Sequence, residues 1–364
     1  MTHIIAIDTS CDDTSVAISE DRKIIANVFW SKLKVHSDWG GVVPSEAKRQ
    51  HAEFLNPAIE EAFKQANLTI NDIDYIAVTY GPGLAIALEA GIDKAKELAT
   101  KYNKKIIAVN HMIGHIYANL ALDIEGKPLS SIKNDFEFPS LALTISGGHT
   151  DLYIMNGHLQ FTHIGQTIDD AIGESFDKVG RMLGMGFPAG AKIEKAAELG
   201  DPDAYKFPTP MSQTDDFNWS YSGLKTAVLY EIHKQIGDYS TKPQKNTFKL
   251  EDASKFLTAQ TINDIAASFQ KAATKALTIK LQKAIKHYKP KAFIVGGGVI
   301  ANQYVRSQIQ KICDENHIPL SFPEPMWLCT DNAAMIAIAA HFYADNQNFV
   351  KDLKTLDRIP NLHI

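Results

Sequence analysis

The chain has 364 residues, of which 45% are hydrophobic and 22% charged, and its formal net charge at pH 7 is −5. This composition is typical of a soluble globular protein and excludes a disordered or fibrous chain, while the length leaves room for one large domain or two moderate ones. The negative charge argues against a protein that wraps nucleic acid unaided, because such binding depends on Lys and Arg neutralising phosphates. A nucleic-acid substrate would need local basic surface or partners.

The sequence lacks the marks of a secreted or membrane-bound protein. Its three cysteines, Cys11, Cys313 and Cys329, are too few and too scattered for a disulfide framework, which indicates a reducing compartment. No apolar run approaches the roughly 20 residues that span a bilayer, and a strand-like segment begins at His3, which leaves no room for a signal peptide. The sequence therefore predicts a cytoplasmic protein without membrane attachment.

A short apolar strand, a polar turn and a second apolar strand occur twice, at residues 4–18 and again at 141–154. Two such hairpins predict two related halves. Their turns can expose consecutive backbone N–H groups, and two facing turns could hold a polyphosphate between two lobes. Two ordinary hairpins without a ligand are the alternative.

Helix and strand patterns alternate along the rest of the chain, which favours an α/β fold over an all-β or all-α one. The expected strands are residues 73–80, 105–110 and 292–295. The expected helices are residues 45–66, 84–102, 168–183, 222–235, 253–287, 302–316 and 331–344. A polar stretch at 237–252 is expected to form an inserted surface loop.

The sharpest local feature is a pair of histidines, His111 and His115, directly after an expected strand. Their spacing places both imidazoles on one helix face, where they could share a metal ion. Met112 stands where the glutamate of a zinc peptidase would activate water, so a peptidase would lack its general base. Asp331 is a candidate third ligand, although an aspartate at the start of a helix can also serve simply as an N-terminal cap.

Two glycine clusters, at residues 146–150 and 295–299, each follow a strand and favour a nucleotide ligand, because backbone without side chains can approach a phosphate closely. Neither cluster matches the Rossmann or P-loop patterns. Asp8, Asp12 and Asp13 in the first turn could steer a magnesium-bound phosphate or only shape the turn.

The segment 169–178 is rich in carboxylates, most of which we expect to face solvent or the other lobe. Asp177 is the exception, because it precedes a turn-like stretch at 186–190 that could close over a ribose.

In chain order these motifs match one known family. They are Asp8-Thr9-Ser10-Cys11-Asp12, Gly81-Pro82-Gly83-Leu84, His111-Met112-Ile113-Gly114-His115, Ser146-Gly147-Gly148-His149-Thr150, Phe176-Asp177-Lys178, Ser222-Gly223-Leu224-Lys225-Thr226 and Gly296-Gly297-Gly298-Val299. The chain resembles the TsaD family of tRNA N6-adenosine threonylcarbamoyltransferases. Single motifs are weak, but their ordered occurrence from residue 4 to about 340 is specific.

The resemblance implies a two-lobed, actin-like ATPase fold of the sugar kinase and Hsp70 superfamily, with duplicated mixed-sheet halves and a nucleotide cleft between them. The expected lobes are residues 1–120 with 330–364, and residues 121–329. The family's metal ligands carry over to His111, His115 and Asp331 for one divalent ion, iron or zinc. Its adenylate-binding positions fall on Thr144, Ile145, Ser146, Gly147, Gly148, Asp177, Gly190 and Asn302.

The resemblance also implies the reaction: the threonylcarbamoyl group of threonylcarbamoyl-adenylate passes to the exocyclic amine of the adenosine beside the tRNA anticodon, and AMP leaves. A separate synthase makes the adenylate, the cleft could also hold Mg-ATP, and a paralogous subunit and a small ATPase complete a modification complex. Residues 45–66 could form a docking face or only pack on the core. No general base is evident in the sequence.

Three departures from the family pattern stand out: Asp13 replaces the usual glutamate, the stretch at 186–191 replaces a Pro-Gly-Gly-Pro run, which makes Gly190 less secure as a ligand position, and Glu89 is unusual in the helix after Gly83. The alternatives are an ATP-dependent small-molecule kinase of the same superfamily, a zinc peptidase and a non-catalytic paralogue. The histidine pair argues against the kinase and the paralogue, and the absent glutamate argues against the peptidase.

Overall fold

The structure is a computed structural model, and it describes residues 1–30, 44–132, 135–237 and 256–364. The surface loop expected at 237–252 lies, apart from Gly237, outside the described residues. Within the described ranges no helix is both long enough and apolar enough to cross a bilayer.

The first sheet has five strands in the order β3-β2-β1-β4-β5. β1 and β2 form the expected antiparallel hairpin, and β4 joins β1 in parallel. Most residues of β1, β2 and β4 are buried on both faces, which is why these strands are nearly continuous apolar runs. The strands are β1 (His3–Asp8), β2 (Thr14–Glu20), β3 (Lys23–Trp30), β4 (Tyr75–Gly81) and β5 (Lys105–Asn110).

The second sheet repeats this plan with five strands in the order β10-β9-β6-β7-β8. β6 and β7 form the second expected hairpin, and β9 joins β6 in parallel. The prediction of duplicated mixed-sheet halves is therefore confirmed. The strands are β6 (Ser140–Ile145), β7 (Thr150–Gly157), β8 (Gln160–Gln166), β9 (Ala292–Gly296) and β10 (Leu320–Ser321).

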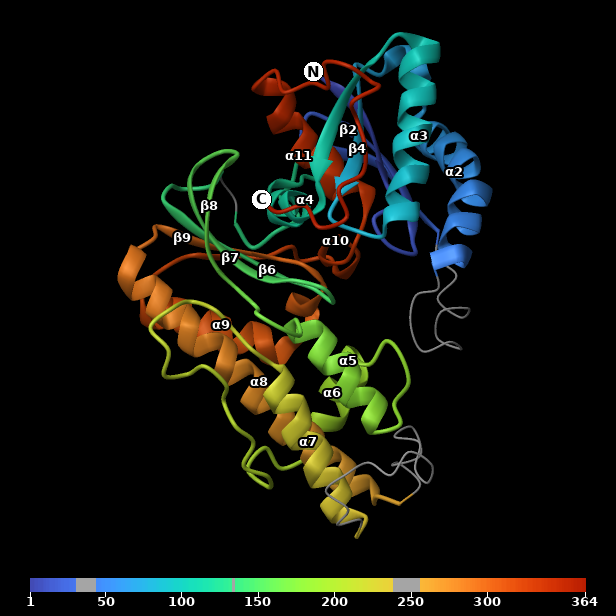
Figure 1. Ribbon diagram of the computed structural model, residues 1–364. Coiled ribbons are helices and arrows are strands. Elements are labelled where there is room, and N and C mark those ends of the chain that lie inside the picture. Colours follow the sequence, from blue (N-terminus) through green and yellow to red (C-terminus); the bar gives the residue numbers. More distant parts are fainter. Residues whose placement is uncertain (31–43, 133–134, 238–255) are drawn as a thin grey trace.

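Helices lie outside and between the two sheets (Figure 1). α2 (Pro44–Ala66) and α3 (Ala85–Tyr102) cover the outer face of the first sheet, while α4 (His111–Tyr117) and α11 (Ala333–Asp345) lie between the sheets. We call the first sheet with α2, α3 and α11 lobe 1, and the second sheet with its own helices lobe 2. The helices on the outer side of lobe 2 are α5 (Ile172–Met182), α6 (Gly190–Ala197), α7 (Ser222–Gln235), α8 (Ala259–Tyr288) and α9 (Gln303–Glu315).

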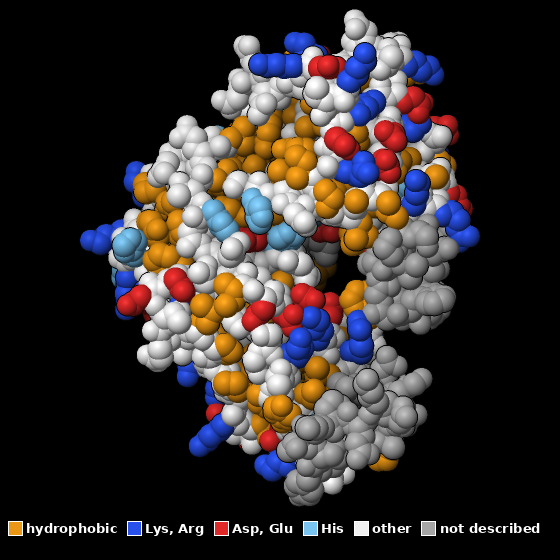
Figure 2. Space-filling model, viewed as in Figure 1, with side chains coloured by type: hydrophobic (Ala, Val, Ile, Leu, Met, Phe, Trp, Pro, Cys, Tyr) orange, Lys and Arg blue, Asp and Glu red, His pale blue; other side chains and the backbone are white. Residues whose placement is uncertain are grey.

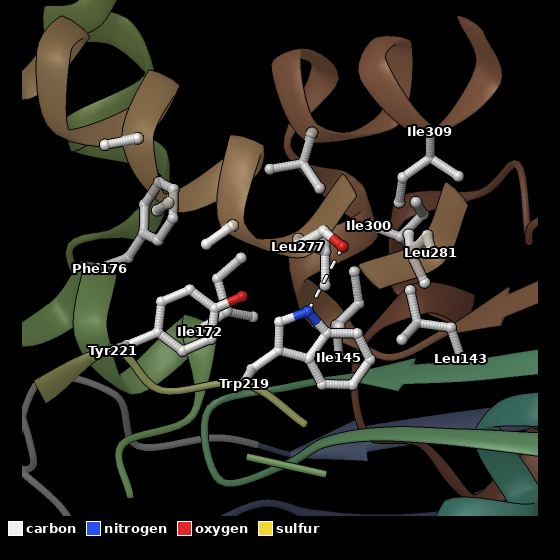
Figure 3. Packing of buried hydrophobic residues seen from close by; sticks show 14 of the residues in the cluster. Leu143, Ile145, Ile172, Phe176, Trp219, Tyr221, Leu277, Leu281, Ile300 and Ile309 are labelled. Carbon is white, nitrogen blue, oxygen red and sulfur yellow. Dashed lines mark hydrogen bonds between the residues drawn. The ribbon is translucent and has the colours of Figure 1, made fainter. Parts of the chain in front are cut away.

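The outer core of lobe 2 is built around large aromatic side chains (Figure 3). Trp219 and Tyr221 are almost completely buried, and the Trp219 indole N–H donates to the Leu277 carbonyl at 3.4 Å. Phe176 packs edge-on against Phe269, with ring centroids 5.0 Å apart. Truncating one such ring typically costs about 3–5 kcal/mol, so these side chains fix α5, α7 and α8 on the sheet.

The helix expected at 168–183 begins later than predicted, at Ile172. The Asp169 carboxylate accepts hydrogen bonds from the hydroxyls of Ser220 and Ser222, both at 2.6 Å. Asp170 pairs with Lys178 and Lys225, at 2.6 and 2.7 Å. Asp169 is exposed, as expected, while Asp170 is largely covered, and both acids join the starts of α5 and α7 within lobe 2.

Candidate functional site

The histidine pair lies on α4, which begins where β5 ends. Asn110 caps this helix: its side-chain oxygen accepts from the backbone N–H of Met112 at 2.8 Å. One turn separates His111 from His115, and their ring centroids are 4.8 Å apart. The prediction that both imidazoles share one helix face is confirmed.

Asp331 reaches this pair from a position distant in the sequence. Its Oδ1 lies 3.3 Å from the Nε2 of His111 and 3.1 Å from the Nε2 of His115. The alternative role as a helix cap is wrong, since Asn332 caps α11 by accepting from the backbone N–H of Met335 at 2.9 Å. The carboxylate of Asp331 is therefore free of the helix end and directed at the histidines.

Burial and charge oppose each other in this triad. Burial disfavours the charged form of His111, but the carboxylates of Asp331 and Asp8 outweigh it and raise the pKa to about 10. Burial and the neighbouring His111 lower the pKa of His115. Burial would raise the pKa of Asp331, yet both histidines hold it well below its ordinary value. The triad thus pairs one ionised carboxylate with one protonated imidazole, and a bound cation could supply the positive charge in place of that proton.

The three side chains offer two nitrogens and one oxygen, all within 4.8 Å of one another. The Nδ1 atoms of His111 and His115 are buried without a hydrogen-bond partner among the described residues. Two imidazoles and one carboxylate are a common donor set for zinc and for non-haem iron. The residues present therefore fit a divalent metal ion.

Asp8 stands behind the triad. It is 3% exposed, and its Oδ2 lies 3.6 Å from the Nδ1 of His111. A carboxylate in this position fixes the orientation of an imidazole ligand. Of the other acids in the first turn, Asp13 lines the adjacent cavity, and both Asp12 and Asp13 take part in interactions with other residues.

Two neighbouring cavities open at this site, between the lobes and into lobe 2; Figure 2 shows this face of the molecule hollowed between the lobes. The metal-side cavity has a volume of about 430 Å³. It is lined by Ser10, Cys11, Asp13, Pro82, Gly83, Leu84, His111, Ser146, Gly147, Gly148, His149, Gly298, Thr330 and Asp331.

The second, the lobe 2 cavity, has a volume of about 390 Å³. It is lined by Gly147, Gly173, Phe176, Asp177, Pro188, Gly190, Ala191, Glu194, Gly298, Val299, Ala301, Asn302, Met326 and Thr330. Gly147, Gly298 and Thr330 line both cavities, so the two spaces adjoin. A ligand with two chemically different ends could occupy both.

Most of the expected adenylate-binding residues meet around these cavities. Ser146, Gly147 and Gly148 line the metal-side cavity, and Gly147 also lines the lobe 2 cavity with Asp177, Gly190 and Asn302. Thr144 and Ile145 lie inside β6, are fully buried and line neither cavity.

The loop before α6 is held by Asp177, whose carboxylate accepts from the backbone N–H of Ala189 at 2.7 Å. Burial raises the pKa of Asp177 above its ordinary value. Gly190 is the first residue of α6 rather than part of the turn, and a side chain there would meet nothing within 4 Å. The start of this helix therefore borders the lobe 2 cavity, with its first N–H groups bonded to Asp177.

Asn302 has a structural role that the sequence suggested only in part. It caps α9, where its side-chain oxygen accepts from the N–H of Val305 at 2.9 Å, and its amide donates to Gln270 at 2.9 Å. Its side chain is 8% exposed. A ligand in the cavity could therefore bind the Asn302 side chain only alongside its existing bonds to Val305 and Gln270.

Sequence reasoning missed the support given by the C-terminal segment. The N–H of Gly83 donates to the Pro360 carbonyl at 3.0 Å, and the side chain of Asn110 donates to the His363 carbonyl at 3.3 Å. A side chain at Gly81 would approach the Ile359 carbonyl to 2.1 Å. The sequence of this segment has no helix or strand periodicity that would predict its position. The only sequence feature that reflects the contact is the presence of glycine at positions 81 and 83, which the segment approaches closely.

Comparison with known proteins places this site in a family. The family model described as TsaD, tRNA N6-adenosine threonylcarbamoyltransferase, matches residues 23–338. The chain belongs to this family. Family membership identifies the protein as a transferase that acts on tRNA.

Curated relatives of the chain carry the name of the same family. The chain is 43% identical to the tRNA N6-adenosine threonylcarbamoyltransferase of Thermosipho melanesiensis over 99% of both chains. It is 42% identical to the protein of the same name from Staphylococcus haemolyticus, over 94% of this chain and 91% of that one. The kinase, peptidase and non-catalytic alternatives are not favoured.

Solved structures share the fold at low sequence identity. Full-length HypF is 12% identical with a TM-score of 0.54, over 95% of this chain and 55% of that one. Component A of (R)-2-hydroxyglutaryl-CoA dehydratase from Acidaminococcus fermentans is 13% identical with a TM-score of 0.51, over 95% of this chain and 100% of that one. The two-lobed actin-like fold is therefore confirmed.

Proposed function

We propose that the protein transfers the threonylcarbamoyl group of threonylcarbamoyl-adenylate to the exocyclic amine of the adenosine beside the tRNA anticodon, with release of AMP. One observation carries this function: a His-His-Asp triad lines a cavity that adjoins a glycine-lined cavity in lobe 2. A mixed anhydride has two unlike ends, an acyl group and a nucleotide. The metal-side cavity, which holds the triad, suits the acyl group, and the lobe 2 cavity suits the nucleotide.

His111, His115 and Asp331 would hold one divalent metal ion, iron or zinc, at the metal-side cavity. When bound, such an ion supplies a Lewis acid that polarises the carbonyl of the group to be transferred. Asp8 would keep the His111 ring in the orientation that binding requires.

The adenylate would lie in the lobe 2 cavity. The phosphate would lie along Ser146, Gly147 and Gly148, where the missing glycine side chains let it approach the backbone closely, and beside Gly190 at the start of α6. Asp177 and Asn302 would contact the nucleoside, while Thr144 and Ile145 would act through the strand that carries the turn.

Orientation would be the main contribution to the rate. AMP is a good leaving group, whereas an amine conjugated with the adenine ring is a weak nucleophile. Holding both partners in reacting geometry can supply roughly 7–11 kcal/mol of the barrier. The adjoining cavities would achieve this by fixing the anhydride at both ends.

The substrate tRNA carries many phosphates, whereas the chain has a net charge of −5. We therefore propose that a paralogous subunit and a small ATPase assist binding in the cytoplasm, and that a separate synthase supplies threonylcarbamoyl-adenylate. We also place the lobe boundaries at residues 1–120 with 330–364, and 121–329. Lobe 2 would then carry the adenylate and lobe 1 most of the metal site.

The direct test incubates the protein, its synthase and partner subunits with labelled threonine, bicarbonate, ATP and tRNA, and then digests the RNA to nucleosides. We expect label in a modified adenosine only when this protein and the tRNA are both present. Label found solely in small phosphorylated metabolites would instead support the kinase. Omitting the synthase and supplying threonylcarbamoyl-adenylate should restore transfer, which separates this step from the synthesis of the adenylate.

A further inference from the structure

A third histidine lines the metal-side cavity outside the triad. His149 lies in the turn between β6 and β7, on the same cavity wall as Ser146 and opposite the lobe 1 residues. Its backbone is fixed, since its N–H donates to the Ser146 hydroxyl at 3.1 Å and its carbonyl accepts from the Ser146 N–H at 2.9 Å. The turn therefore holds the imidazole beside the space shared with His111 and Asp331.

The imidazole of His149 makes no hydrogen bond or ion pair with any residue that the structure describes. The other titratable groups on the cavity wall differ. His111 and Asp331 contact each other in the triad, and Asp13 takes part in another interaction. Burial raises the pKa of the Cys11 thiol, so that group keeps its proton at neutral pH. Only the histidine combines an available nitrogen with a neutral basic form.

We propose that His149 accepts the proton that the adenosine amine loses during transfer. The inference rests on the proposed function and adds to it a catalytic residue. The amine nitrogen forms a bond to the carbamoyl carbon, and the bond from that carbon to the phosphate oxygen of the adenylate breaks. The electron pair of the broken bond leaves on AMP, and the amine proton passes to an imidazole nitrogen.

The chemistry of the amine requires such a group. Its lone pair is conjugated with the ring, so it is a weak base before attack and becomes strongly acidic as the new bond forms. A neutral imidazole within reach can take the proton without a prior step. Imidazole also returns the proton to solvent readily after AMP leaves, because its ordinary pKa is close to neutral.

The surroundings keep His149 in the form that accepts a proton. Burial is the largest influence on its pKa and lowers it, while the nearby carboxylate of Asp151 opposes this effect. The net direction is downward, so the imidazole is uncharged at pH 7.

The experiment compares single-turnover transfer by the wild-type complex with that of His149→Asn and His149→Ala, using tRNA and threonylcarbamoyl-adenylate. Asparagine keeps a polar side chain of similar reach but cannot accept the proton. We expect the transfer rate of both variants to fall about 100-fold or more, since a positioned base contributes about 10²–10⁴-fold. Apparent affinities for both substrates should stay within about twofold. Added imidazole should restore a measurable part of the rate to His149→Ala but not to His149→Asn.

Metal content and a matched histidine provide the controls. Both variants should bind the same amount of iron or zinc as wild type. His287→Asn carries the same substitution on an exposed histidine of α8, which packs at a tilt against Phe217 and lines neither cavity, and it should transfer at the wild-type rate.

Several results would overturn the inference. They are an unchanged rate in His149→Asn, a loss of rate that follows a loss of metal, a loss expressed only as weaker substrate binding, or a lost rate in His149→Ala that imidazole leaves unchanged. Failure of the wild-type complex to modify any tRNA would refute the proposed function itself. These two failures are separate, because every variant is judged against a wild type that is active.

Discussion

The two hairpin turns at the cleft have the same topology but opposite surroundings. The turn after β1 is partly covered, although Ser10, Cys11 and Asp13 still line the metal-side cavity. The Ser10 carbonyl accepts from the N–H of Leu84 at 2.8 Å, and the Thr9 hydroxyl donates to the Ala87 carbonyl at 2.8 Å. A side chain at Gly83 would approach the Ser10 carbonyl to 2.3 Å. In the turn after β6, a side chain at Gly147 or Gly148 would meet nothing within 4 Å.

This difference shows how a duplicated element came to serve two purposes. The covered turn presents a buried carboxylate, Asp8, to the His111 ring. The open turn presents bare backbone to a cavity. Lobe 1 therefore contributes charge through side chains, and lobe 2 contributes main chain that no side chain shields.

The largest effect should come from His111→Ala, which removes a side chain of the triad. A bound Lewis acid supplies several kcal/mol of stabilisation and each 1.4 kcal/mol corresponds to tenfold, so we expect transfer to fall by about 10³-fold or more. The ring is almost buried between Asp8 and Asp331, so we expect a lower thermal unfolding midpoint in a variant that still folds at the assay temperature. Single-turnover assays and metal analysis test this expectation, and wild-type turnover in the variant would refute the metal site.

Asp8→Asn tests the charge that the covered turn supplies. The amide keeps the size of the side chain but loses the charge that faces His111 at 3.6 Å. We expect metal affinity to fall about 10–100-fold, the usual effect of losing a carboxylate behind a histidine ligand. Competition with a chelator measures this affinity, and His3→Asn, a surface histidine paired with Glu20, serves as a control. Unchanged affinity would mean that Asp8 only shapes the turn.

The pair Gly83→Ala and Gly147→Ala compares the two turns directly. The first substitution places a methyl group against the Ser10 carbonyl, and we expect it to lower the free energy of unfolding by about 1–3 kcal/mol. The second meets open space and should leave that free energy unchanged while weakening adenylate binding. Urea unfolding and adenylate titration of both variants separate these outcomes. Equal destabilisation by both would show that the turns are equivalent.

Asp170→Asn should give the smallest effect and should depend on pH. Burial alone would raise the pKa of Asp170, but Lys178 and Lys225 outweigh it and lower the pKa. A carboxyl with a lowered pKa in the folded state stabilises the protein above its unfolded pKa of about 4, and this contribution is lost as the pH falls. We expect a loss of at most about 1 kcal/mol at pH 7 that shrinks toward pH 3 in urea unfolding. A loss independent of pH would contradict this assignment.

Much of this molecule follows from local pattern. Both hairpins, the helices at residues 84–102 and 222–235 and the face shared by His111 and His115 follow from apolar spacing, because those contacts are close in sequence. The approach of Asp331 was expected from the family resemblance and has no local signal, since that residue lies 220 positions from His111.

What local pattern cannot decide is which of several polar residues takes a given role. Asp331 and Asn332 are both good helix caps, and only the position of α4 leaves the aspartate for the histidines. Asp169 could have capped an α5 that began two or three residues earlier, but its carboxylate instead accepts hydrogen bonds from Ser220 and Ser222. Such choices depend on partners that the fold brings from elsewhere in the chain.

The location of α11 has a consequence for the synthesis of the protein. This helix packs against β1 and β2. One face of the first sheet therefore stays uncovered after its strands leave the ribosome, until residues 333–345 have also been synthesised. Lobe 2 is made entirely in between, at roughly 5–20 residues per second. The nascent first sheet therefore exposes an apolar face for many seconds, which makes it a natural client for a chaperone.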